Sequence, residues 1–400
     1  MAKQKETAAT GSREDSTDSK TLIRYTTIKV RLYPTKEQAA LFNKTFGCCR
    51  YIWNQMLADE QEFYAATGQH FIPTPAKYKK DAPFLKEVDS QALVQVHQNL
   101  KRAFQFFFDQ PDVYGYPSFK SKQNAKDTYQ IYCHHYDTGQ PSSIYLTKDG
   151  IRLPKAKIVK AEFHRRPLHW WTLKYAVITR SRSGKYYCSL LYQYPVRETE
   201  PIQPDPEKTV GLNYSMAHFY TDSDGYQPDP PHWLRDSEQK LAEMQRKLSR
   251  MTEGSRNYKE QLHKIQLLHE HIANQRRDFI HKESRRITNE RDAVCVRGDN
   301  LVDMSRVLKL GNVYDSGFGK FRLCLAYKLE RAGKRYITVD QHTATVKTCR
   351  ICGCVNENLH LRDRTWICPH CGALLDREAN AAINIREEGL RQITQNTQNM

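Results

Sequence analysis

The chain reads Cys-Arg-Ile-Cys over residues 349–352, Cys-Pro-His-Cys over 368–371 and Asp-Arg-Glu-Ala-Asn-Ala-Ala-Ile-Asn-Ile over 376–385. Two Cys-x-x-Cys turns at this separation supply four thiolates to one tetrahedral zinc, because each tight turn presents two sulfurs and a short β excursion connects the turns. Four thiolates leave no open position on the metal, so the sequence predicts a structural zinc ribbon. The predicted ligands are Cys349, Cys352, Cys368 and Cys371.

The charge of the chain indicates the kind of partner. The 400 residues include 62 Lys and Arg against 45 Asp and Glu, which gives a formal net charge of +17. Such an excess favours a polyanionic partner, and nucleic acid is the first candidate. A basic surface that is merely solvated is the alternative. The length predicts two or three domains with cores of their own.

Cysteine usage and hydropathy bear on the compartment. The turns hold four of the 11 cysteines and the other seven are scattered, so we expect no disulfide framework and a reducing cytoplasm. Residues 1–20 are hydrophilic, and no run of about 18 apolar residues occurs anywhere. We therefore expect no signal peptide and no membrane partner, and a disordered tail over 1–20.

The first half of the chain combines helices with strands. Alternation predicts a strand over 26–32, and Pro34-Thr-Lys-Glu is typical of a helix start, followed by an apolar stripe as far as Leu57. A second helix is expected over 90–108, and its aromatic stripe is interpreted as core.

Strands and a linker follow these helices. Residues 124–194 show the strand pattern, with a basic hairpin turn at 180–184. A β-barrel or sandwich is implied. Four prolines between 195 and 206 predict a linker and the main domain boundary.

The second half follows an α/β plan related to RNase H. The expected elements are a strand over 209–213, a second strand over 217–220, an antiparallel helical hairpin over 232–290, a strand over 293–296, a helix over 318–332 and a strand over 335–339. The hairpin has a basic face. This face either lines a nucleic-acid channel or is simply solvated.

Six short motifs carry a resemblance to a known family. They are residues 31–38 (Arg-Leu-Tyr-Pro-Thr-Lys-Glu-Gln), 45–54 (Thr-Phe-Gly-Cys-Cys-Arg-Tyr-Ile-Trp-Asn), 90–93 (Ser-Gln-Ala-Leu), 115–122 (Gly-Tyr-Pro-Ser-Phe-Lys-Ser-Lys), 349–353 (Cys-Arg-Ile-Cys-Gly) and 380–385 (Asn-Ala-Ala-Ile-Asn-Ile). Together they resemble TnpB, the transposon-encoded RNA-guided nuclease related to type V CRISPR effectors. The resemblance runs from about residue 26 to residue 390.

The resemblance implies a multidomain α+β protein. Its expected parts are a wedge-like β-barrel (21–33 and 124–200), an inserted helical recognition domain (34–123), a RuvC-like α/β domain (206–347 and 373–392) with the helical hairpin at 232–290, the zinc ribbon (348–372) and a tail (393–400). It also implies a bound guide RNA, and double-stranded target DNA with a short adjacent motif. The implied location is the bacterial cytoplasm, at the nucleoid.

RuvC nucleases use three metal-binding carboxylates, and the chain departs from that set. In TnpB the first is an Asp that closes a Gly-Ile-Asp strand, and this chain has Gly-Leu-Asn213 there. The second is a Glu on a later strand, and alignment places Arg297 at its position. The third belongs to an Asp-Arg-Asp motif, which reads Asp376-Arg-Glu378 here.

The electrostatic cost of placing Arg297 near magnesium ions determines whether a metal site is expected. Active sites of this type hold two Mg²⁺ about 3.5 to 4 Å apart. A guanidinium ~4 Å from a divalent ion costs roughly 8 kcal/mol, twice the value for a unit pair at an effective dielectric near 20. With Arg297 present and Asn213 uncharged, we expect no catalytic magnesium and no enzyme activity. The open alternative is that Asp299 or Asp303 takes the second carboxylate position.

The function that follows is RNA-guided DNA binding without cleavage. In this respect the chain resembles the TldR group of RNA-guided transcription repressors, which implies repression by occupying a promoter. Two alternatives stay open: an active RNA-guided DNA endonuclease with an atypical metal site, and an RNA-binding regulator of a transposon transcript. Metal-dependent cleavage and guide-dependent DNA capture distinguish the three.

Candidate nucleic-acid contacts come from the resemblance and from side-chain chemistry. Gln and Asn suit adenine, Arg suits guanine or phosphate, and aromatic residues next to lysines suit stacking with phosphate contact. A purely structural role is the alternative for each. The candidates are Arg50, Asn54, Gln91, Gln95, Tyr116, Phe119, Lys120 and Lys122. We expect the first four on exposed faces of the recognition helices.

Overall fold

A computed structural model gives the structure of the chain. It describes residues 21–136, 142–197, 202–215, 218–228, 232–300, 317–360 and 362–398. The expected tail over 1–20 and the alternative ligand Asp303 lie outside these ranges. The chain divides into two compact units, Met1–Glu198 and Thr199–Met400. The division falls within the proline-rich stretch at which the sequence predicts a linker.

The first unit contains a seven-stranded antiparallel sheet with the order β2-β6-β7-β1-β5-β4-β3. Its strands are β1 (Thr21–Tyr33), β2 (Asp127–Tyr132), β3 (Tyr145–Leu146), β4 (Gly150–Leu153), β5 (Lys157–Glu162), β6 (Thr172–Arg180) and β7 (Tyr186–Arg197). Among the described residues no ladder pairs β2 with β3, although Ser143 N donates to His134 O (2.9 Å) beside them. Among the described residues the strand pairing does not close between β2 and β3, so the wedge-like β-barrel that the resemblance implies stays a prediction.

Two strands run further than the sequence predicts. β1 begins at Thr21, and β7 continues through Pro195, which pairs with Ile23. Proline has no N–H to give to a ladder, so it is confined to strand edges. The pairing of β7 with β6 ends at Gln193, and Pro195 therefore stands where one edge of β7 is free. The linker begins after this residue rather than at it.

The helices of the first unit carry the start signals read from the sequence. They are α1 (Lys36–Thr67), the short helices η1 (Pro75–Lys79) and η2 (Pro83–Lys86), and α2 (Ser90–Asp109). Thr35 and Gln38 form a capping box at the start of α1, and Gly68 ends it with φ of 68°. α2 thus matches its predicted position, and α1 begins where the sequence predicts but continues to Thr67, beyond the apolar stripe that ends at Leu57.

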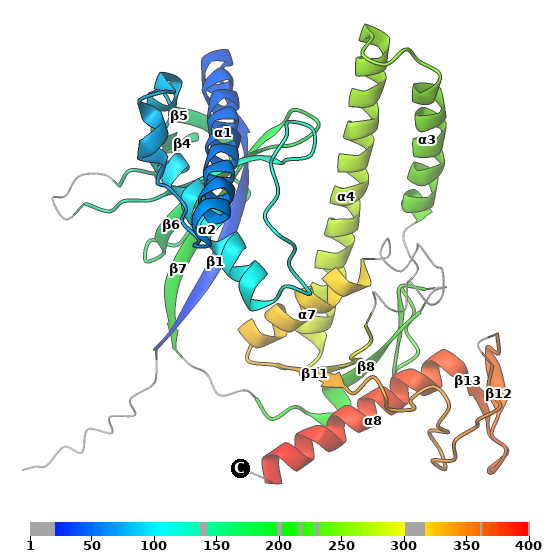
Figure 1. Ribbon diagram of the computed structural model, residues 1–400. Helices are drawn as coiled ribbons and strands as arrows, with labels where there is room; N and C mark the ends of the chain where they lie inside the picture. Colours follow the sequence, from blue (N-terminus) through cyan, green and yellow to red (C-terminus); the bar gives the residue numbers. More distant parts are fainter. Residues whose placement is uncertain are drawn as a thin grey trace, which may run out of the picture. The chain divides into compact units, whose positions relative to one another are not determined.

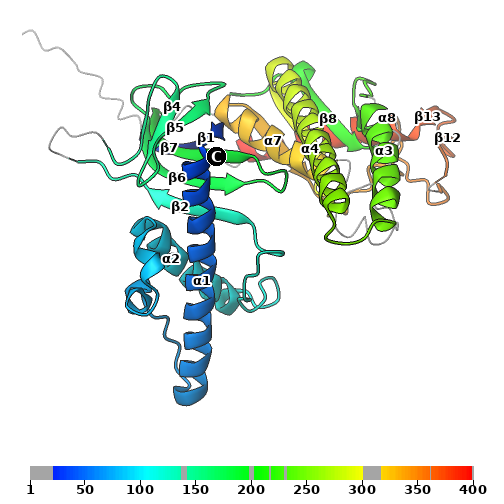
Figure 2. The same cartoon turned by 90° about the horizontal axis from the view of Figure 1, so that it is seen from above.

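These helices and the sheet share one hydrophobic core. Phe42 and Phe46 of α1 contact the ring of Tyr129 on β2, with ring centroids 6.3 and 5.5 Å apart. Leu93 and Leu100 of α2 are fully buried in the same cluster. Figures 1 and 2 show α1 and α2 side by side, and Figure 2 shows β2 next to them. The helical segment 34–123 therefore packs onto the sheet and shares its hydrophobic core.

The second unit is built on a four-stranded sheet with the order β11-β10-β8-β9. Its strands are β8 (Thr209–Tyr214), β9 (Tyr220–Asp222), β10 (Ala293–Arg297) and β11 (Arg335–Val339), and the short helix η3 (Pro206–Lys208) precedes them. β10 runs parallel to β8 and β11, whereas β9 is antiparallel to β8. The second strand begins at Tyr220, later than the predicted 217–220.

Helices cover both faces of this sheet. Cys295 of β10 packs with Ile385 of α8 (Arg377–Gln398) on one face. Its neighbours Val294 and Val296 pack on the other face with α4 (Arg256–Glu290) and α7 (Phe318–Arg331). Burial on both faces explains why β10 is an uninterrupted apolar run. α8 continues to Gln398, so residues 393–398 are helix and not the expected tail.

Two further parts complete the second unit. α3 (His232–Ser249) and α4 form the predicted antiparallel hairpin, visible in Figures 1 and 2. The antiparallel strands β12 (Thr365–Ile367) and β13 (Leu374–Asp376) form the hairpin of the ribbon. β13 leads directly into α8, which places the cysteine turns next to the start of that helix (Figure 1).

Candidate functional site

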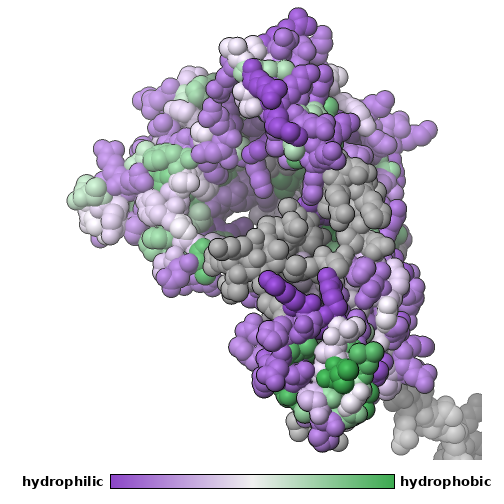
Figure 3. Space-filling model, turned by 90° about the vertical axis from the view of Figure 1, so that its right-hand side faces the viewer, coloured by the Kyte–Doolittle hydropathy of each residue, from purple (hydrophilic) through white to green (hydrophobic). Residues whose placement is uncertain are grey.

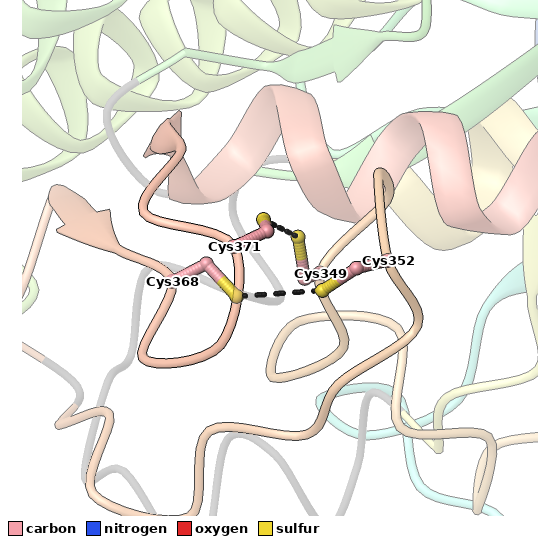
Figure 4. A group of neighbouring side chains, drawn as sticks. All are labelled: Cys349, Cys352, Cys368 and Cys371. Carbon is pink, nitrogen blue, oxygen red and sulfur yellow. Dashed lines mark hydrogen bonds between the residues drawn. The ribbon is translucent and has the colours of Figure 1, made fainter.

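Four cysteines converge as the sequence predicts. The Sγ atoms of Cys349 and Cys371 are 3.7 Å apart, and those of Cys352 and Cys368 are 3.6 Å apart (Figure 4). All four Sγ atoms lie within 4.8 Å of one another. Zinc–thiolate bonds of about 2.3 Å give a tetrahedron with edges of roughly 3.8 Å. The cluster therefore fits one zinc ion with four thiolate ligands.

Backbone hydrogen bonds shape both turns of the cluster. Gly353 N donates to Cys349 O (2.9 Å) and Gly372 N donates to Cys368 O (3.0 Å), with φ of 74° and 70° at the two glycines. The N–H groups of Cys371 and His370 lower the pKa of the Cys368 thiol to about 6, against the desolvation that raises it. These N–H groups therefore favour the thiolate form of Cys368, which is the form that binds a metal.

Two asparagines of α8 fasten the segment that enters the ribbon. Asn380 accepts from Arg350 N (3.0 Å) and donates to Thr348 O (2.8 Å). Asn384 donates to Thr345 O (2.8 Å) and to Thr348 O (2.7 Å). Asn380 is buried. These side chains are satisfied by the backbone, so the asparagines of the quoted motif position the ribbon against α8.

The residues that align with nuclease carboxylates gather at one edge of the sheet. Val296 of β10 pairs with Leu212 of β8 in a parallel ladder. The next residues along the two strands are Arg297 and Asn213, so these lie side by side where the strands end. The carboxyl ends of parallel strands are the usual location of sites in open α/β sheets.

Arg297 is held at this edge by two contacts. Its Nε lies 2.7 Å from Asp299 Oδ1, and its Nη1 donates to Thr345 Oγ1 (3.3 Å). The side chains of Arg297 and Asp299 are only 22% and 16% exposed, so the pair is shielded from water. Asp299 is therefore already paired with a guanidinium, which bears on its candidacy as a metal ligand.

The two acidic residues at the start of α8 have different roles. Asp376 Oδ1 accepts from Ala379 N (2.8 Å) and so caps the helix. Glu378 accepts from Thr221 Oγ1 (2.9 Å), and its other oxygen lies 3.4 Å from Arg364 Nη1. Thr221 is the pairing partner of Asn213, which brings Glu378 to the same edge as Arg297.

Two predicted nucleic-acid contacts are used inside the first unit instead. Arg50 forms an ion pair with Asp127 (2.7 Å), which Arg180 also contacts. Asn54 accepts from the backbone N of Lys120 (2.8 Å) and donates to its carbonyl oxygen (2.9 Å). These bonds fasten α1 to segments far along the chain. Arg50 and Asn54 are thus half-buried and not on an exposed face, and their contact with nucleic acid stays a prediction.

Gln95 is also buried, against the expectation of an exposed face. It is 2% exposed, its Nε2 donates to Asn99 Oδ1 (3.0 Å), and its Oε1 has no partner among the described residues. Gln95 lines a cavity of about 610 Å³, together with Arg50, Phe119 and Lys120. Lys120 Nζ lies 3.2 Å from the ring centroid of Trp53, and burial lowers its pKa to about 8.

The other predicted contact residues are accessible. Tyr116 is 43% exposed and donates its hydroxyl to Glu60 (3.0 Å), and Phe119 is 49% exposed. Lys122 is exposed and Gln91, in the first turn of α2, is half-buried. The segment 116–122 thus presents aromatic and basic side chains together, as stacking with phosphate contact requires.

Three contributors to the sheet edge were not found from the sequence. Thr221 holds Glu378, Thr345 contacts Arg297, and Arg364 reaches Glu378 from the ribbon. The run Arg-Asp-Arg at 362–364 was a visible signal for the last of these. The two threonines had no signal, because only the sheet pairing and the turn after β11 bring them to the edge.

The ribbon also exposes apolar side chains. Ile367 and Leu374 are direct partners across β12 and β13 and are 65% and 71% exposed. In Figure 3 an apolar area surrounded by hydrophilic residues lies in the lower part of the face, over the ribbon.

Comparison with known proteins agrees with this architecture. Residues 192–308 match a family model described as a probable transposase, and residues 318–385 match a Cas12f1-like TNB domain. Residues 24–69 match a model described as a helix-turn-helix domain; in this structure the range holds most of β1 and all of the single helix α1.

Individual proteins match over most of the chain. A "Putative RNA-guided DNA endonuclease" of Streptomyces pristinaespiralis is 31% identical and is aligned over 90% of this chain and 89% of its own. "Putative RNA-guided DNA endonuclease InsQ" of Escherichia coli (strain K12) is 27% identical, over 90% and 91% respectively. The protein in the "Cryo-EM structure of the Cas12f1-sgRNA-target DNA complex" superimposes with a TM-score of 0.53 at 13% identity, covering 92% of this chain and 99% of that one.

The fold is Cas12f-like, with a RuvC-like domain and a zinc-ribbon-like domain. The chain belongs to the TnpB family. Within the described residues, no helix has both the length and the apolarity that a membrane crossing needs.

Proposed function

We propose that this chain is a nuclease-inactive, RNA-guided DNA-binding protein. One observation carries the proposal: Arg297 and Asn213 directly follow the paired residues Val296 and Leu212, at the edge where a RuvC nuclease holds its metal ions. The guanidinium of Arg297 lies 2.7 Å from Asp299 there. The relatives named putative RNA-guided DNA endonucleases support the RNA-guided part. The net charge of +17 suits a protein that holds two nucleic acids.

The electrostatics of the edge argue against a pair of magnesium ions. Arg297 contributes a positive charge and Asn213 contributes none, so Glu378 is the remaining carboxylate of the aligned set. Asp299 would have to leave its guanidinium partner to bind a metal, and Arg297 would then stand unpaired next to a divalent ion. By the same estimate as above, that arrangement costs roughly 8 kcal/mol for each ~4 Å contact.

The proposed action is occupation of DNA. Guide RNA pairs with the target strand. The protein holds this RNA–DNA heteroduplex by contacts to the sugar-phosphate backbone, and it reads a short adjacent motif on the DNA. A complex that does not cut stays on its site and blocks transcription there, as in the TldR group. The ribbon zinc is structural in this account, because four thiolates leave no position for a catalytic water.

The test is guide-dependent cleavage. The protein with its guide and a matched duplex is incubated with Mg²⁺ or Mn²⁺, and a duplex without the matching sequence is the control. We expect no cleavage above the control. Restoring the carboxylates together (Asn213→Asp, Arg297→Glu and Glu378→Asp) should yield metal-dependent cuts, whereas each change alone should not, because a ligand would still be missing. Guide-dependent cuts by the unaltered protein would refute the proposal.

An active endonuclease is the second candidate. The carboxylate that Glu378 still supplies at this position, held by Thr221 at 2.9 Å, and the names of the relatives favour it. The same cleavage assay decides between the two. If the guide-loaded protein neither cuts nor captures matched DNA, the remaining candidate function is RNA binding that regulates a transposon transcript.

A further inference from the structure

The C-terminal ends of α1 and α2 carry an acidic surface on a basic chain. Residues 59–72 and 104–114 contain five carboxylates and no Lys or Arg, although the whole chain has a net charge of +17. We call these two segments the acidic tip. Its exposed carboxylates are those of Glu62, Asp109 and Asp112, and none of the three forms an ion pair within the described residues.

Aromatic rings connect the two segments of the acidic tip. Phe71 packs on Phe63 of α1, with ring centroids 5.5 Å apart. Directly beside this pair in the chain, His70 stacks on Tyr64 (4.3 Å) and also contacts Phe108 of α2 (4.8 Å). The four Phe and Tyr residues are between 37 and 56% exposed. The acidic tip therefore presents accessible rings and free carboxylates together.

The two remaining carboxylates hold the acidic tip in shape. Glu60 is fully buried, and its Oε1 lies 2.5 Å from Nδ1 of His70. Its Oε2 accepts from the hydroxyl of Tyr116 (3.0 Å), just after the second segment. Asp59 forms an ion pair with Lys77 (2.6 Å). These contacts fix the segments after both helices onto α1, so the surface is formed before any partner arrives.

The charge of the acidic tip indicates the class of its ligand. The phosphates of a nucleic acid would face Glu62, Asp109 and Asp112, which disfavours RNA and DNA even though aromatic rings stack on bases. Two tips placed against each other would oppose like charges, which disfavours a symmetric contact with a second copy. Exposed rings beside carboxylates instead suit Arg and Lys side chains, through cation–π contact and ion pairing.

The area of the exposed rings sets the size of the contact. Four aromatic residues at these exposures leave roughly 400 Å² of ring surface. A patch of this size on a single chain is often functional. It is about half of the ~800 Å² that each partner contributes to a stable complex. A short segment of a partner is therefore enough to cover it.

We propose that the acidic tip docks a segment of another protein that presents Arg or Lys beside apolar side chains. The cationic groups meet Glu62, Asp109 and Asp112, and the apolar side chains meet the rings around Phe71. The inference goes beyond the proposed function, which needs only RNA and DNA as partners, and it does not depend on that function.

The chain offers a matched pair of ring variants for the test. Phe71 and Phe84 are 56% and 40% exposed, and each packs on one ring of α1. These rings are Phe63 at 5.5 Å and Tyr51 at 5.3 Å, which lie about 18 Å apart along α1 at 1.5 Å per residue. Phe71→Ser and Phe84→Ser therefore remove equivalent rings, and only the first belongs to the acidic tip.

A second pair of variants tests the charge. Glu62→Lys and Glu37→Lys each reverse one exposed carboxylate of α1, the first at the acidic tip and the second in the opposite, first turn of the helix. Neither change removes a packed ring. Glu62→Lys therefore decides the question even if Phe71→Ser fails to fold.

The first measurement is binding of short labelled peptides to the full chain, purified free of nucleic acid. One peptide combines Arg with Leu, a second has Glu in place of Arg, and a third has Ser in place of Leu. We expect the first to bind most tightly. Phe71→Ser should weaken its binding about tenfold, as the loss of a central aromatic contact does, and Glu62→Lys should weaken it several-fold. Phe84→Ser and Glu37→Lys should leave it unchanged.

The outcomes that overturn the inference are specific. Tip variants that bind the first peptide as their controls do would overturn it, and so would equal binding of the peptide that carries Glu. Phe71→Ser should not change the sedimentation of the chain, because loss of self-association would make a second copy the occupant. It should also leave binding of a single-stranded oligodeoxynucleotide unchanged. Weaker binding would assign the acidic tip to nucleic acid instead.

Discussion

A Cβ atom on Gly211 would lie 2.1 Å from the carbonyl oxygen of Ala382, so the bare backbone of β8 sets how closely α8 packs on the sheet. Gly211 stands two residues before Asn213, and Ala382 stands one turn after Glu378. The close approach of β8 and α8 therefore fixes the distance between Asn213 and Glu378 at the sheet edge. A side chain at Gly211 has to push the helix away, because the opposing atoms are backbone.

Gly211→Ala should destabilise the second unit by about 1 to 3 kcal/mol, the usual cost of overpacking a core. Gly47→Ala is the control, because a Cβ at Gly47 in α1 meets nothing within 4 Å. In a helix interior that change should be neutral or stabilise by up to about 1 kcal/mol. Urea unfolding of the two variants measures the difference. Equal stability of both would show that α8 does not rest on β8 at this point.

Asn380→Asp should weaken the attachment of the ribbon to α8. The new carboxylate would face the carbonyl oxygen of Thr348, to which Nδ2 now donates at 2.8 Å. The loss of a buried donor costs about 1 to 3 kcal/mol. Asn358→Asp, at an exposed position of the same segment, should stay within about 0.5 kcal/mol of the unaltered protein. Thermal unfolding checks both, and similar values for the two would contradict the fastening role.

The purified protein should contain one zinc per chain. Cys352→Ser should lower the zinc content and the thermal stability, because it removes one of four thiolates. Cys354→Ser should change neither, since Cys354 lies outside the cluster of four. Elemental analysis of the three proteins is the measurement. Unaltered protein without zinc would refute the ribbon assignment.

Lys120 should make the stability of the first unit depend on pH. Its folded-state pKa of about 8 lies below the usual 10.5, because burial disfavours the charged form. The unfolded chain then binds more protons between these values, so the free energy of unfolding rises with pH over that interval. The stability difference between the unaltered protein and Lys120→Met should therefore change from about pH 8 to pH 10.5 in favour of the unaltered protein. A difference independent of pH would show that Lys120 is not desolvated.

Local signals made much of the fold predictable. The Pro34-Thr-Lys-Glu run predicted the start of α1, where the structure has a capping box of Thr35 and Gln38. The two Cys-x-x-Cys turns predicted the ribbon. The apolar run at β10 gave a strand buried on both faces. Each of these rests on residues within one turn or one strand, which is the range over which a sequence pattern determines its own structure.

The features that the sequence did not predict depend on contacts between residues that are far apart in the chain. Arg50 has the chemistry of a nucleic-acid contact, but Asp127 pairs with it from 77 residues away. Gln95 looked exposed on a helix, yet the segment around Lys120 closes over it to form the cavity. Pro195 looked like a linker residue, and only the end of β6 pairing shows why it fits a strand. Side-chain type alone does not distinguish such structural roles from binding roles.

The most direct test of the whole account is capture of DNA by the protein loaded with either of two different guides. The bound DNA is sequenced and its ends are examined for cuts. The account predicts that the captured sites change with the guide, share one adjacent motif and remain uncut in Mg²⁺. Sites that stay fixed after the guide is exchanged, or that are cut, would contradict it.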